Sequence, residues 1–136
     1  MADSAVGIRW NGAGLEFEGG APGRPEARVD GNGRTAPSPV QTLLLSLAAC
    51  TGSDILEIAT KMRVRITSLD VTIEGDRNAD FPRRFHTIRV RFRAGGVAEA
   101  DRAKIRRAVQ LSQETYCSVL HTLRPDLAFS SEIEFA

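Results

Sequence analysis

The sequence predicts a small α+β domain, and three observations support this class. The first third alternates apolar and polar residues around glycine-rich breaks, which is typical of short strands. A proline-started apolar segment then indicates one long helix, and two further alternating runs indicate a second set of strands. The 136 residues suit one domain, residues 1–136, since folded units cluster at about 100 to 150 residues.

The composition excludes several classes of protein. With 18 basic and 17 acidic residues the net charge is +1, so no basic excess points to a nucleic-acid partner. The positive charge of the local basic run at 102–107 is offset by neighbouring acidic residues, so we interpret this run as a solvated helix face. Residues 1–5 lack the features of a secretory signal, and no window holds about 18 consecutive apolar residues. We therefore expect a cytoplasmic protein without a membrane segment.

The N-terminal strands are expected at 6–11, 14–18 and 26–30, as a half-buried antiparallel meander. The turn residues Asn11 and Gly12 and the other glycines separate them. A glycine- and proline-rich loop at 31–39 ends in Ser38 and Pro39, which suit the cap and the first turn of a helix.

The long helix is expected at 40–62, where no proline interrupts the chain. Such a helix would run about 35 Å at 1.5 Å per residue. Its segment 43–50 (LLLSLAAC) is apolar or small on every side, which indicates burial all round. Because a domain of this size cannot cover such a helix completely, we expect a partner subunit to cover part of it.

The remaining elements follow the same logic. Residues 64–75 and 85–94 alternate as a long hairpin, and 98–111 has the spacing of an amphipathic helix. Ser112 can break and recap the chain, so a short helix is expected at 115–123, opening just before Cys117. Residues 127–135 alternate again and close the sheet.

Cys50 and Cys117 are the residues most able to carry chemistry. They lie 67 positions apart, which excludes a C-x-x-C motif, and His86 and His121 alone do not complete a metal-ligand pattern. The sequence therefore predicts no metal and no cofactor. In a reducing cytosol the two thiols are either inert core residues or a reversible redox pair. His121, four residues after Cys117, could face the same side of a helix, although both histidines also suit ordinary partly exposed positions.

Two segments carry a resemblance to a known family. Residues 38–62 (SPVQTLLLSLAACTGSDILEIATKM) and 115–119 (TYCSV) resemble the OsmC/Ohr family, named for osmotic induction and organic hydroperoxide resistance. Both cysteines stand at the family spacing, with the hairpin between them. The motif looks closer to a less characterised branch than to the best-known peroxidases.

The resemblance implies an intertwined α+β homodimer, with antiparallel sheets and the long helices buried at its centre. It also implies thiol-dependent reduction of organic hydroperoxides, with Cys50 as the peroxidatic thiol and Cys117 as the resolving thiol. An external dithiol would then reduce the resulting disulfide.

The chain departs from the well-studied members before the first cysteine. They carry a glutamate nine or ten residues before it, which orients an activating arginine, whereas Gln41 and Val40 occupy those positions here. Two alternatives therefore stand beside the peroxidase: a non-catalytic dimer that binds a small apolar ligand, and a structural dimer with buried thiols. The family arginine matches no single residue among Arg9, Arg24, Arg28 and Arg34.

Overall fold

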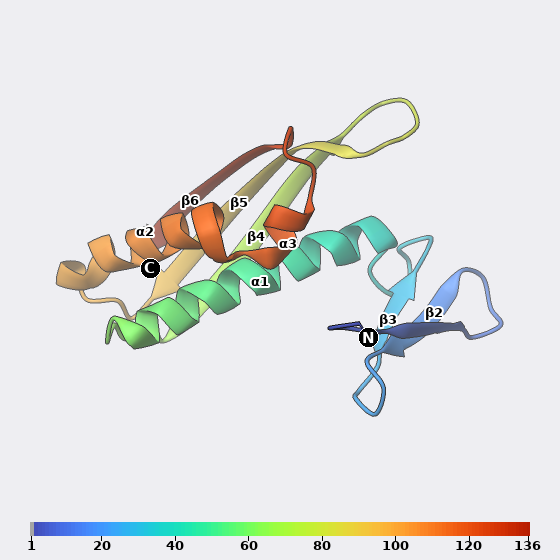
Figure 1. The fold of residues 1–136 in the computed structure, drawn as a ribbon, viewed down its shortest axis with the longest axis horizontal. Helices are drawn as coiled ribbons and strands as arrows, with labels where there is room; N and C mark the ends of the chain where they lie inside the picture. Colours follow the sequence, from blue (N-terminus) through green and yellow to red (C-terminus); the bar gives the residue numbers. More distant parts are fainter. Residues whose placement is uncertain (1) are drawn as a thin grey trace. The chain divides into compact units, whose positions relative to one another are not determined.

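A computed structural model describes residues 2–136 of the chain. The described chain divides into two compact units, one up to Leu43 and one from Leu44 onward. Figure 1 shows the elements of both units. The α+β class is confirmed, while the assignment of 1–136 to one domain stays a prediction.

The first unit contains an antiparallel sheet of three strands in the order β1-β2-β3. The strands are β1 (Gly7–Trp10), β2 (Glu16–Gly20) and β3 (Ala27–Asp30), close to the expected meander. All four residues of β1 are exposed, so the expected half-burial is wrong for this strand. The physical reason is that the unit itself provides no second layer over that strand.

The loop after β3 is organised by a buried carboxylate, Asp30. Its oxygens accept hydrogen bonds from the backbone N–H groups of Asn32 at 2.9 Å, Arg34 at 3.0 Å and Thr35 at 3.0 Å. These donors, with Thr35 first, hold the pKa of Asp30 at about 2, below its ordinary value of 3.8, against the opposing effect of burial. The loop is thereby held in one conformation just before the long helix begins.

The long helix α1 (Pro39–Lys61) agrees with the expected 40–62 to within one residue at each end. It begins with a reciprocal cap, in which the Gln41 N–H donates to Ser38 Oγ at 3.2 Å and the Ser38 N–H donates to Gln41 Oε1 at 2.9 Å. After its last turn, Arg63 adopts a left-handed φ of 59° and the Val64 N–H donates to the Ala59 carbonyl at 2.8 Å. This is the geometry of a Schellman stop.

The second unit contains a mixed sheet. Strands β4 (Ser68–Arg77) and β5 (Phe85–Gly95) form the expected antiparallel hairpin, and β6 (Ala128–Phe135) pairs with β5 in parallel. The expectation that both sheets are antiparallel is therefore wrong for this strand pair. A parallel pair needs a long crossover. It is formed by η1 (Glu99–Asp101), α2 (Arg102–Leu111), η2 (Ser112–Tyr116) and α3 (Ser118–Thr122).

The core of this unit lies between one face of the sheet and the helices that cover it, α1 and α2 (Figure 1). Gly52 marks the approach of α1 to β4, since a Cβ there would lie 3.5 Å from Val71 Cγ2. The opposite sheet face is charged and carries cross-strand ion pairs such as Arg91 with Glu132 at 2.7 Å. The buried apolar residues include Leu47, Ile55, Ala59, Ile88, Val90, Phe92, Ile105, Val109 and Cys117.

The helix α1 is buried on one face only. Leu45 and Leu56 remain 55% and 45% exposed, so the single chain leaves part of the helix uncovered, as expected for a domain of this size, while its burial by a partner subunit stays a prediction. The sheet and the crossover reach only the face that carries Leu47, Ile55 and Ala59. By length and composition alone α1 could also cross a membrane, a criterion that the core helix of a folded protein meets equally well.

Candidate functional site

Helix α1 presents a thiol and a carboxylate on one side, one turn apart. Cys50 and Asp54 stand at positions i and i+4, which are neighbours on a helical surface. Both side chains are half-buried, so they lie at the margin of the core. The pair is fixed to a rigid element rather than to a loop.

The second thiol is positioned by an irregular turn. Helix α2 runs without a break into the π-helical turn η2, and the chain becomes extended at Cys117 (φ −72°, ψ 98°) before α3. The expected break at Ser112 is therefore wrong, and α3 begins after Cys117 instead of before it. The Cys117 N–H donates to the Ser112 carbonyl at 2.9 Å, and Cys117 itself caps α3. Single π-helical turns within helices are frequently found at functional sites.

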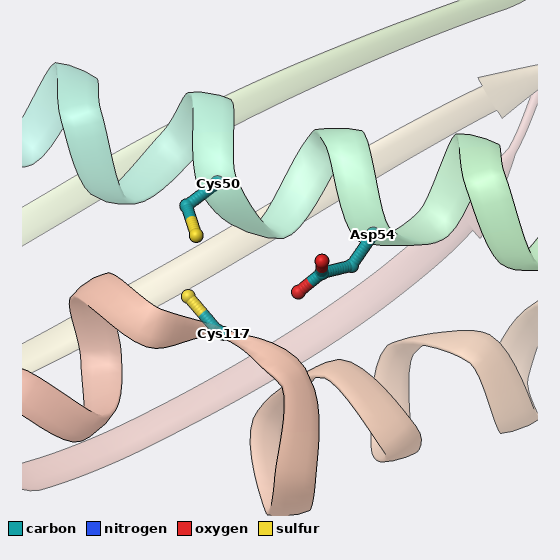
Figure 2. Close-up of side chains that lie close together, drawn as sticks. All are labelled: Cys50, Asp54 and Cys117. Carbon is teal, nitrogen blue, oxygen red and sulfur yellow. The ribbon is translucent and has the colours of Figure 1, made fainter. Parts of the chain in front are cut away.

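The fold brings these groups together. The sulfurs of Cys50 and Cys117 and a carboxylate oxygen of Asp54 all lie within 4.8 Å of one another. Figure 2 shows the two side chains of α1 directed toward Cys117, which comes from the junction before α3. Both thiols are free. The expectation that the two distant cysteines become neighbours is confirmed, while their catalytic roles stay predictions.

The two thiols differ in their surroundings. Cys50 is half-buried, whereas Cys117 is 0% exposed. Burial, with smaller contributions from the neighbouring Cys50 and Asp54, raises the pKa of Cys117 to about 11. The Leu120 N–H, which donates to Cys117 Sγ at 3.4 Å, opposes this shift. Cys117 is therefore a neutral thiol at neutral pH.

Asp54 is the member of the site that the sequence analysis did not identify. Its Oδ2 accepts a hydrogen bond of 2.8 Å from the hydroxyl of Ser112, which is buried at the start of η2. The i+4 spacing from Cys50 was the available signal. Neither histidine joins the cluster: His86 is exposed on β5 beside Thr87, and His121 is exposed on α3.

No cation is found at the site within residues 2–136. No described lysine, arginine or histidine side chain forms a hydrogen bond or ion pair with Cys50, Asp54 or Cys117. Two of the candidate family arginines have partners in their own sheet, Arg9 with Glu26 at 3.2 Å and Arg28 with Glu18 at 3.9 Å.

The fold and the site together define an α+β protein with a paired-thiol site at its long helix. The model of the family described as OsmC-like protein matches residues 31–132, and the chain belongs to this family. The curated Protein YhfA of Escherichia coli is 36% identical over 113 residues, which cover 82% of this chain and 83% of the relative.

Solved structures agree on the fold. A hypothetical protein from Aquifex aeolicus matches with a TM-score of 0.81 at 26% identity, over 100% of this chain and 99% of that one. An OsmC-like protein from Mycoplasma pneumoniae matches with a TM-score of 0.80 at 16% identity, over 99% of each chain. The organic hydroperoxide resistance protein OhrB of Bacillus subtilis matches with a TM-score of 0.61 at 19% identity, over 96% of each chain. At these identities the last two show the fold alone.

Proposed function

We propose that this protein reduces organic hydroperoxides by thiol chemistry, with Cys50 as the peroxidatic thiol and Cys117 as the resolving thiol. The observation that carries the proposal is the proximity of two free sulfurs within 4.8 Å in a member of the OsmC-like family. The name of the fold relative OhrB, organic hydroperoxide resistance protein, supports the substrate class.

The difference in exposure supports the proposed roles of the two thiols. Cys50 is partly accessible and can meet a peroxide, whereas Cys117 is buried and its raised pKa keeps it protonated. The Cys50 thiolate attacks the terminal peroxide oxygen, the O–O bond breaks, and the alkoxide leaves as an alcohol after taking up a proton. Cys50 becomes a sulfenic acid.

The second step uses the buried thiol. Cys117 loses its proton and attacks the Cys50 sulfur, forming a disulfide and releasing the oxygen as water. A disulfide has an S–S length of about 2.05 Å, so the sulfurs must move together from their present separation. An external dithiol then restores both thiols and leaves as its own disulfide. We place this cycle in a cytoplasmic homodimer, in which a second subunit would cover the exposed Leu45 and Leu56.

One observation favours a second candidate, a non-catalytic dimer that binds a small apolar ligand. Gln41, at a position where well-studied members of the resembled family carry a glutamate, is engaged in the cap of α1 with Ser38. A thiolate also needs a positive group or hydrogen-bond donors nearby, and the described residues provide no cation at Cys50. The peroxidase proposal is preferred because it accounts for both cysteines.

The test measures consumption of cumene hydroperoxide by the full chain with dithiothreitol as the dithiol. We expect turnover well above the rate of the dithiol alone, and a fall to that background in Cys50→Ser. Cys117→Ser is the matched control, since it should still form a Cys50 sulfenic acid that dimedone traps. Wild-type consumption no faster than the dithiol alone contradicts the proposal, as does unchanged turnover in Cys50→Ser.

A further inference from the structure

The cluster of Cys50, Asp54 and Cys117 contains a carboxylate that peroxide reduction does not use. The three ligand atoms belong to groups that bind metal ions in proteins, and all lie within 4.8 Å of one another. Figure 2 shows them directed toward a common region between α1 and the junction before α3. The spacing of the three residues along the chain does not predict this proximity, because they come together only in the folded structure.

The spacing is close to that of a tetrahedral site. Zinc lies about 2.3 Å from thiolate sulfur and about 2.0 to 2.2 Å from carboxylate oxygen. A tetrahedral arrangement therefore separates two sulfurs by about 3.8 Å and a sulfur from an oxygen by about 3.5 Å. Ligand atoms that already lie within 4.8 Å reach these separations through small side-chain rotations.

Two of the ligands are oriented by neighbouring donors. The Leu120 N–H donates to Cys117 Sγ at 3.4 Å, and the Ser112 hydroxyl donates to Asp54 Oδ2 at 2.8 Å. Outer hydrogen bonds of this kind fix ligand orientation and affect metal affinity. The other carboxylate oxygen, Oδ1, accepts no hydrogen bond from the described residues, so it is available as a ligand.

The charge of the cluster also favours a cation. Once a bound ion has displaced both thiol protons, two thiolates and a carboxylate carry three negative charges at the edge of the core, and no described basic side chain pairs with them. A divalent ion compensates this charge, and the two sulfur ligands favour a zinc-like ion over magnesium or calcium.

We propose that reduced Cys50 and Cys117, together with Asp54, form a three-ligand site for a thiophilic divalent cation of the zinc type, with a water molecule in the fourth position. Binding releases one proton from each thiol and forms two metal–sulfur bonds. A bound ion occupies both sulfurs, so metal binding and disulfide formation exclude each other. The site requires no reaction with peroxide and goes beyond the proposed function.

The test uses Co²⁺ as a spectroscopic substitute for zinc, with the reduced full chain under anaerobic conditions. We expect one Co²⁺ per chain, with visible bands typical of tetrahedral cobalt and a near-ultraviolet sulfur-to-cobalt charge-transfer band. The charge-transfer intensity should fall by about half in Cys50→Ser and in Cys117→Ser. Stoichiometric Zn²⁺ should displace the cobalt and abolish the bands.

Asp54 is tested by a conservative exchange. Asp54→Asn keeps the shape of the side chain and its contact with Ser112, and we expect Co²⁺ affinity to fall roughly tenfold or more. Glu57→Gln, on an exposed position of the same helix, is the matched control and should bind as the wild type does. Circular dichroism of each variant verifies that the fold is retained.

Three results overturn the proposal: no charge-transfer band in the wild type, only the weak spectrum of octahedral cobalt, or unchanged affinity in Asp54→Asn. Peroxide consumption is measured separately on metal-free protein. A chain that binds cobalt but leaves peroxide intact refutes the peroxidase alone, and the reverse result refutes the metal site alone.

Discussion

Each of the two units of the chain buries an ionisable group, and the pKa values of these two groups are shifted in opposite senses relative to the charged form. In the first unit, Asp30 is 3% exposed and accepts three backbone N–H groups, which hold its pKa at about 2. In the second unit, Cys117 is 0% exposed and accepts one N–H at 3.4 Å, and its pKa rises to about 11. One group is held charged and the other is held neutral.

The comparison shows that the balance between burial and hydrogen-bond donors decides whether a buried acid is charged. Burial opposes ionisation at both positions; three backbone N–H groups and the Thr35 hydroxyl overcome it at Asp30, while one N–H does not overcome it at Cys117. The difference matches their roles. A charged, saturated carboxylate locks a loop, whereas a neutral thiol beside Cys50 and Asp54 stays available for a later reaction or for a metal ion.

The largest expected effect is a slow reaction of Cys117 with iodoacetamide. In Cys50→Ser, we expect alkylation at pH 8 to be more than about tenfold slower than for an ordinary exposed cysteine, since burial, the largest cause of the raised pKa of Cys117, remains when Cys50 is removed. The measurement is the rate of mass increase by mass spectrometry.

A single exposed thiol provides the reference for that rate. Ala79 lies exposed in the loop between β4 and β5, so Ala79→Cys in a chain that lacks both native cysteines reports ordinary reactivity. If the alkylation rate of Cys117 is within about tenfold of this reference rate, its pKa is not strongly raised. The proposed contrast with the pKa of Asp30 is then wrong.

The next effect is the loss of the Asp30 contribution in acid. Because the pKa of Asp30 is lowered from 3.8 to about 2 by folding, its stabilisation is present above pH 4 and is lost as the pH falls toward 2. We expect Asp30→Asn to lower Tm by roughly 5 °C at pH 6, with the gap to the wild type narrowing below pH 4. Thermal unfolding at pH 6, 4 and 2.5 measures this gap.

The exposed Asp3 gives the control for general charge effects, through Asp3→Asn. That variant should follow the wild type at every pH. A gap for Asp30→Asn that stays constant between pH 6 and pH 2.5 would show that the loop depends on the shape of residue 30 and not on its charge.

Much of this arrangement could be predicted from the sequence, because local signals and the global fold agree there. Ser38 and Pro39 predict the start of α1, and the alternation of apolar and polar residues predicts β4 and β5. The proximity of Cys50 and Cys117 followed only from the family resemblance, since spacing along the chain carries no such information.

The features that could not be predicted from the sequence arise from tertiary contacts. Ser112 looks like a helix break, but its hydroxyl is bonded to Asp54 and the helix continues as a π turn. The direction of β6 depends on the crossover and not on its alternation, which is the same in parallel and antiparallel strands. Incomplete coverage of α1 was expected from the size of the domain, but which of its residues stay exposed, such as Leu45, depends on which layers reach the helix.

The smallest expected effect isolates the charge of Asp54. Among the causes that raise the pKa of Cys117, burial comes first and the negative charge of Asp54 comes last. In the Cys50→Ser background, Asp54→Asn should therefore speed alkylation of Cys117 at pH 8 only by about two- to threefold. Glu57→Gln in the same background should leave the rate unchanged, because its side chain lies outside the cluster. A tenfold or larger increase in the alkylation rate in Asp54→Asn would contradict this order of causes, since charge repulsion and not burial would then keep Cys117 protonated.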